Sequence, residues 1–123
     1  AGAKRLIPLN VSGPFHTALL KPASEKLALE LENVDFRDFQ VPLVGNTEAK
    51  VMEKNQIKSL LARQVMEPVR FYESIDTMKE LGLTKVIEIG PGKVLSGFLK
   101  KIDKNIEALA VEDEAILQAL LNP

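Results

Sequence analysis

The chain has 123 residues, of which 46% are hydrophobic and 27% charged, enough for the core of one ordinary globular domain. Its net charge of -1 argues against a nucleic-acid-binding protein, whose surface is usually strongly basic. The absence of cysteine excludes a disulfide, a thiol nucleophile and a zinc–thiolate site, and it is compatible with a cytoplasmic location. No apolar run approaches the roughly 20 residues that span a bilayer. We therefore expect neither nucleic acid nor a membrane as a partner.

The first half of the chain predicts two strands with a helix between them. The apolar run over 4–11 is typical of a strand. Apolar residues that recur at spacings of three and four, Leu20, Ala23, Leu27 and Leu31, predict a helix over 18–32 with Pro22 in its first turn. A short apolar strand, Val41–Val44, is expected to end at Gly45.

The second half alternates between strand and helix patterns. Helices are predicted over 54–66, 68–81, 93–103 and 113–121, and strands over 86–89 and 106–111. Gly82 is expected to end the helix 68–81. Because strand, helix, strand and helix follow one another, the predicted fold class is α/β with a parallel sheet and right-handed connections.

The single histidine, His16, follows the first strand-like run and lies among the turn-forming residues of VSGPFHT. Histidine accepts and returns protons near neutral pH, and loops at strand ends often carry catalytic groups in α/β proteins. His16 is therefore a candidate general base, and an ordinary loop histidine is the alternative. We expect no metal, because carboxylates alone would have to complete the ligand set.

A general base needs a nucleophile, and the sequence offers no suitable serine. The serines are Ser12, Ser24, Ser59, Ser74 and Ser96. None lies in a G-x-S-x-G elbow, the strained turn that exposes a nucleophilic serine. Ser12 lies only four residues before His16 and is not expected to meet it productively.

The turn GPGK, over 90–93, combines glycines, a helix start and a lysine, as phosphate-binding turns do. It matches neither G-x-G-x-x-G nor the P-loop pattern, so a tight strand-to-helix turn is the alternative. Lys93, Lys100, Lys101 and Lys104 form a basic cluster on and after the following helix. The cluster is either a solvated face that complements the helix dipole or a docking surface for an acidic partner.

Gln64 is a polar residue on the expected inner face of the helix 54–66, three residues after Leu61. An unpaired buried amide costs about 1–3 kcal/mol, so Gln64 should have a definite partner. The alternative is that this edge of the helix faces solvent beside Arg63.

Four stretches share the order and spacing of one enzyme family: VSGPFHTALLKPASEKL, VPLVGNTEAK, LARQVMEPVRFYESI and EIGPGKVLSGFLKKI. Together they closely resemble the malonyl-CoA:acyl carrier protein transacylases of bacterial fatty-acid synthesis. The resemblance implies that a serine in a G-H-S-x-G elbow takes malonyl from malonyl-CoA and passes it to the phosphopantetheine thiol of acyl carrier protein. Coenzyme A and phosphopantetheine are substrate groups, so the resemblance implies no cofactor.

The resemblance also implies roles for single residues. His16 matches the catalytic histidine, and Gln64 matches the glutamine whose main-chain carbonyl orients that histidine. Asn46 matches an asparagine at the end of a core strand near the site. Gly90, Pro91 and Gly92 then form a structural turn beside the pocket.

The elbow serine, the oxyanion loop and the malonyl-binding arginine belong to the family's N-terminal half, which this chain does not resemble. We therefore expect the C-terminal portion of such an enzyme, inactive alone, with the missing N-terminal half as a partner. Residues 13–123 would form a partial hydrolase-like core. Residues 1–12 would form the last strand of a small ferredoxin-like subdomain.

Two other interpretations remain open at this point. One is a non-catalytic module that binds coenzyme A or phosphopantetheine through GPGK and the lysine cluster. The other is a structural chain that completes the sheet of another protein. The binding-module interpretation predicts that the chain binds coenzyme A or phosphopantetheine and that this affinity does not depend on His16.

Overall fold

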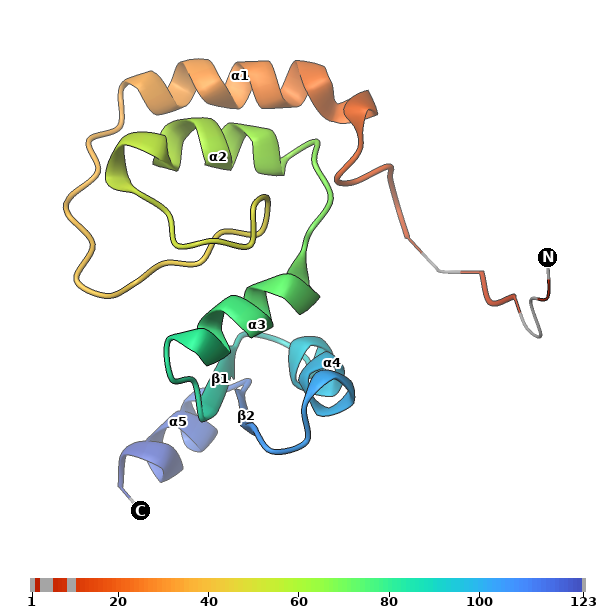
Figure 1. The fold of residues 1–123 in the computed structure, drawn as a ribbon, viewed down its shortest axis with the longest axis vertical. Helices are drawn as coiled ribbons and strands as arrows, with labels where there is room; N and C mark the ends of the chain where they lie inside the picture. The colour runs from red at the N-terminus through yellow and green to blue at the C-terminus, as the bar shows by residue number, and fades with distance from the viewer. Residues whose placement is uncertain (1, 3–5, 9–10, 123) are drawn as a thin grey trace.

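The computed structural model describes residues 2, 6–8 and 11–122. In chain order the elements are η1 (Ala18–Leu20), α1 (Lys21–Glu32), η2 (Lys54–Gln56), α2 (Ile57–Gln64), α3 (Phe71–Glu80), β1 (Lys85–Ile89), α4 (Val94–Ile102), β2 (Glu107–Val111) and α5 (Glu114–Leu121). Figure 1 shows α1 and α2 side by side at one end, and the sheet with α4 and α5 at the other. The chain is mixed α/β, as predicted.

The two strands form a parallel pair joined through α4. Ile89 at the end of β1 lies opposite Val111 at the end of β2. The core beside this sheet is formed by Ile75, Leu99 and Ile106, of which Leu99 is only 1% exposed. The parallel pairing predicted for the second half is therefore confirmed.

A second core lies beneath the helical pair α1 and α2. Met52, Ile57 and Leu60 are buried there, with Phe36 and Phe39 packed against them. The helices run antiparallel, because the end of α1 meets the start of α2: the Lys58 Nζ donates to the Glu32 main-chain oxygen at 3.0 Å. The helix predicted over 18–32 is present as η1 and α1, with Pro22 in the first turn of α1.

The end of α3 is fixed by Gly82, as the sequence predicts. Gly82 has φ +89°, and its N–H bonds to the Lys79 oxygen at 2.9 Å. The Leu83 N–H reaches the Met78 oxygen at 3.1 Å, which completes the paired bonds of a Schellman motif. A residue with a Cβ is strained at this φ, so glycine is the favoured residue.

Two predicted helices are shorter than expected. The helix predicted from 68 begins at Phe71, and Pro68 lies in the preceding extended segment. The helix predicted to 66 ends at Gln64, where the N–H groups of Val65 and Met66 bond to residues three positions back. Pro68 has no N–H to bond to the Gln64 oxygen and so cannot continue the helix.

The strand predicted over Val41–Val44 is wrong. Val44 alone forms an isolated antiparallel bridge, with Val51, and Val41 is 72% exposed. Pro42 has no N–H to donate, which weakens this segment as a ladder. Much of the strand predicted over 4–11 lies outside the described residues, and the described residues 6–8 and 11 are not in a strand.

One face of the sheet carries apolar side chains that the described residues cover only in part. Ile87 and Ile89 on β1 are exposed, Ile89 to 82%. Parallel sheets normally have both faces covered. Among the helices of the described part, none is long and apolar enough to cross a membrane.

Candidate active site

His16 lies in a tight loop just before η1. It has φ +57°, the left-handed conformation that few residues other than glycine adopt. The Thr17 Oγ1 donates to the Pro14 oxygen at 2.8 Å and so ties the two sides of this loop together. A left-handed non-glycine residue costs free energy and persists where surrounding contacts hold it.

The imidazole of His16 is bound to the end of α2. Its Nδ1 lies 2.8 Å from the main-chain oxygen of Gln64. Because a carbonyl oxygen only accepts hydrogen bonds, Nδ1 must carry the proton. In the neutral ring, Nε2 then has a free lone pair and is the atom able to accept a proton.

The position of Gln64 explains why its carbonyl is available. Gln64 is the last residue of α2, and the final carbonyls of a helix have no partner within the helix. The chain beyond it is held by Arg63, whose guanidinium binds Glu67 at 2.7 and 3.0 Å and Glu48 at 2.7 Å. Hydrogen bonds to Glu67 and then Glu48 raise the pKa of Arg63 above its ordinary range.

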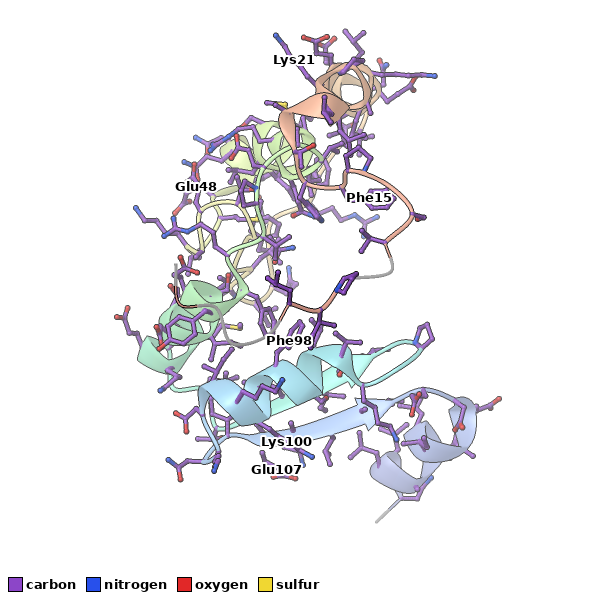
Figure 2. The ribbon with its side chains drawn as sticks, turned by 90° about the vertical axis from the view of Figure 1, so that its right-hand side faces the viewer. Phe15, Lys21, Glu48, Phe98, Lys100 and Glu107 are labelled. Carbon is purple, nitrogen blue, oxygen red and sulfur yellow. The ribbon has the colours of Figure 1, made fainter. Side chains whose placement is uncertain are left out.

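A largely apolar pocket of about 520 Å³ contains this histidine. It is lined by Phe15, His16, Leu20, Ala23, Leu27, Leu31, Leu61, Gln64 and Val65. A larger hollow of about 740 Å³ lies near Phe36 and Lys58, but it holds neither His16 nor Gln64. We therefore place the candidate site at the smaller pocket. In Figure 2, Phe15, which lines this pocket, lies on the loop beside α1. Phe98 and Lys100, which do not line it, lie on α4.

The GPGK turn is filled by a carboxylate of the chain itself. The Gly92 N–H donates to Glu112 Oε1 at 3.0 Å, and the Lys93 Nζ lies 2.9 Å from Glu112 Oε2. At the start of α4, the N–H groups of Leu95 and Ser96 bond to the carboxylate of Glu88 at 3.0 and 2.8 Å. The donors that a phosphate would need are therefore occupied, which favours the structural-turn interpretation.

Comparison with known proteins gives a consistent set of relatives, although no family model matches the chain. The malonyl CoA-acyl carrier protein transacylase of Bacillus subtilis is 51% identical over 118 residues, which is 95% of this chain and 37% of that protein. The protein of the same name from Escherichia coli K12 is 41% identical over 122 residues, covering 98% of this chain and 40% of its own length.

Solved structures agree with these sequences. The crystal structure of MCAT from Streptococcus pneumoniae matches with a TM-score of 0.91 and 67% identity, over 98% of this chain and 40% of that one. The chain is a homologue of malonyl CoA-acyl carrier protein transacylases. A type II PKS acyl-carrier protein in complex with its malonyl-transacylase matches at a TM-score of 0.87 and 44% identity, over 99% of this chain and 40% of that one. The chain spans about two fifths of the length of the transacylases it matches.

The structure brings together only two of the residues that the transacylase resemblance singled out. His16 and Gln64 are hydrogen-bonded, through the main chain of Gln64. Among the described residues, Asn46 bonds to neither, and its main-chain oxygen accepts from the Arg70 N–H at 2.9 Å. The lysines 100, 101 and 104 are exposed on and after α4.

Sequence reasoning missed two residues that hold this part of the fold together. Glu112 directly follows β2, and in a parallel pair the residues after both strand ends meet, so its contact with the GPGK turn was predictable. Ser24 is buried on α1, but nothing in the sequence distinguishes it from an ordinary serine in a helix.

The Lys93–Glu112 pair should make stability depend on pH. The Lys93 ammonium, and then the Gly92 N–H, hold the pKa of Glu112 below its ordinary value of 4.5. A carboxyl whose pKa is lower in the folded state stabilises the fold above pH 4.5, and that contribution is lost as the pH falls through the lowered pKa. Glu112→Gln should therefore lower the urea midpoint at pH 7 and leave it nearly unchanged at about pH 3. Glu30→Gln, at an exposed helix position, is the control; equal effects of Glu112→Gln at both pH values would contradict this account.

Proposed function

We propose that this chain is the C-terminal portion of a malonyl-CoA:acyl carrier protein transacylase and supplies its general base, His16. The observation that supports this most directly is the 2.8 Å bond from His16 Nδ1 to the Gln64 oxygen. That bond fixes the tautomer and leaves Nε2 as the proton acceptor of the ring. In serine hydrolases an aspartate does this work, whereas here a helix-terminal carbonyl does it.

In the first half-reaction, the serine Oγ attacks the thioester carbonyl of malonyl-CoA while its proton passes to His16 Nε2. The C–S bond then breaks, and the proton on Nε2 passes to the departing sulfur of coenzyme A. The products are a malonyl-serine ester, free coenzyme A and a neutral His16.

In the second half-reaction, the phosphopantetheine thiol of acyl carrier protein gives its proton to His16 Nε2. Its sulfur attacks the ester carbonyl, the C–O bond breaks, and Nε2 returns the proton to the serine oxygen. Malonyl is now a thioester on the carrier, and both His16 and the serine have regained their starting states.

We infer that the serine lies on a segment outside this chain. The chain has no nucleophile elbow, and it spans about two fifths of its transacylase relatives. Apolar side chains near His16 support a further segment packing there: Val11 is 70% exposed and Phe15 62%. The open face of β1 is equally suited to further elements of a hydrolase-like core. On the same resemblance, residues 1–12 belong to a ferredoxin-like subdomain.

We also propose malonyl-CoA and acyl carrier protein as partners, in the cytoplasm. The relatives carry these two names, and one similar structure is a complex of a carrier protein with its transacylase. Lys100, Lys101 and Lys104 then provide a basic surface for an acidic carrier protein. Lys93 contributes less, since Glu112 already neutralises it.

The function is tested with the full-length protein that contains this segment. It should transfer malonyl from malonyl-CoA to phosphopantetheinylated acyl carrier protein, followed by the mass of the carrier. The competing coenzyme A-binding module predicts instead that the chain alone binds coenzyme A, with affinity lost in Lys93→Ala and retained in His16→Ala. If the full-length protein transfers no malonyl and the chain alone binds coenzyme A in this way, the binding module is the correct interpretation and the proposed function is wrong.

A further inference from the structure

We propose that Ser24 is a positioning residue for His16 and acts on it through the carboxyl end of α2. The proposal rests on the proposed function, because it gives Ser24 a part in the same proton transfer. Ser24 lies near the start of α1 and is 7% exposed. Its Oγ donates to the main-chain oxygen of Ala62 at 2.7 Å.

Ala62 and Gln64 both belong to the last turn of α2, whose carbonyls lack the i+4 donors of a continuing helix. The Ala62 oxygen accepts only a long bond from the helix side, from the Val65 N–H at 3.3 Å. The continuous segment formed by the His16 loop and the start of α1 supplies a donor to each. Ser24 binds the Ala62 oxygen, and His16 Nδ1 binds the Gln64 oxygen. The end of α2 is therefore attached at two points to the segment that carries the imidazole.

The two attachments differ in their exposure to water. The histidine bond is exposed, whereas the serine bond is buried. Water competes less for a buried hydrogen bond, and without the Ser24 hydroxyl the Ala62 oxygen keeps only the 3.3 Å bond from the Val65 N–H. Ser24 is thus the stronger restraint on the position of the α2 terminus. The other bond between the two helices, from Lys58 to Glu32, is exposed and lies at their opposite ends.

This restraint has a consequence for the chemistry. The Gln64 oxygen orients the imidazole only if it stays at hydrogen-bond distance from Nδ1. Without the Ser24 hydroxyl, the α2 terminus can move relative to the His16 loop, and the ring loses its fixed tautomer and direction. Because both proton transfers use Nε2, the loss should appear in kcat and not in the binding of malonyl-CoA.

The test uses Ser24→Ala in the full-length transacylase that contains this segment. We expect kcat to fall about 5- to 10-fold, with KM for malonyl-CoA unchanged. In protein labelled with ¹⁵N-histidine, the Nδ1–H signal of His16 should be seen in the wild type and weaken in the variant. The signal is assigned by its absence in His16→Gln.

Matched variants separate positioning from general stability. Ser24→Thr keeps the hydroxyl and should recover most of kcat and the Nδ1–H signal. Ser24→Cys keeps the side-chain volume but donates weakly, so it should show the same losses as Ser24→Ala even if the latter folds poorly. Ser59→Ala, near the start of α2, removes an exposed hydroxyl that bonds to the Gln56 oxygen at 2.9 Å, and it should change neither readout.

Two results would overturn the proposal. One is a folded Ser24→Ala enzyme with wild-type kcat. The other is a loss of kcat with an unchanged His16 signal, which would make Ser24 merely structural. If the wild type proves unable to transfer malonyl, the proposed function fails, and the Nδ1–H signal still decides whether Ser24 holds His16 in place.

Discussion

Replacing His16 with alanine in the full-length protein should slow the proposed malonyl transfer about a thousandfold, the largest catalytic effect we expect from a single change in this chain. In the mechanism that we propose, the imidazole accepts a proton in each half-reaction, so its removal should affect both acylation and deacylation of the serine. The rate is followed by the mass of acyl carrier protein in single-turnover mixtures. A variant that keeps more than a tenth of the wild-type rate would remove His16 from its role as base.

Gln64→Ala is the matched control for this change. The bond to His16 uses the main-chain oxygen of Gln64, which alanine retains. The amide side chain is half-buried and, among the described residues, makes no hydrogen bond. We therefore expect Gln64→Ala to retain transfer within about fivefold of the wild type. A loss as large as that of His16→Ala would instead assign the chemistry to the amide.

Leu99→Ala should cost the largest share of stability, about 3 kcal/mol of unfolding free energy. Leu99 lies on α4, is 1% exposed and packs with Ile75 and Ile106 between the sheet and α3. Its truncation removes buried apolar contacts and leaves a cavity that the rigid strands cannot close. Urea unfolding followed by circular dichroism measures the loss.

Leu95→Ala on the same helix controls for helix propensity and for loss of a leucine as such. Leu95 is 45% exposed, so its truncation should cost less than about 1 kcal/mol. Equal losses for both leucines would show that the core assigned around Leu99 does not carry the stability of this part of the fold.

Much of the second half of the fold follows from local signals in the sequence. Gly82 ends α3 where a positive φ is required, and the alternation of strand and helix predicts the parallel pair β1 and β2. These signals act within a few residues, so they need no knowledge of the rest of the molecule. The prediction of a strand at Val41–Val44 failed although the segment has the apolar pattern of a strand. Pro42 has no N–H to donate, and the part of the chain that the structure describes offers it no neighbouring strand beyond the single bridge to Val51.

The candidate site was less accessible to local reasoning. Composition and spacing identify His16 as a possible base. Its partner is a main-chain oxygen 48 positions away, and every residue has a main-chain oxygen, so no residue type in the sequence indicates this contact. The resemblance to transacylases supplied Gln64. The Ser24 bond depends on how α1 packs against α2, which only the structure reveals.

The central claim is that His16 serves a serine that this chain does not contain. The most direct test is the intact mass of the purified 123-residue chain after incubation with malonyl-CoA, beside the full-length protein treated in the same way. We expect the chain to keep its mass and the full-length protein to gain one malonyl group. A stable malonyl adduct on the chain alone would contradict the account, because the attacking group would then lie within these residues.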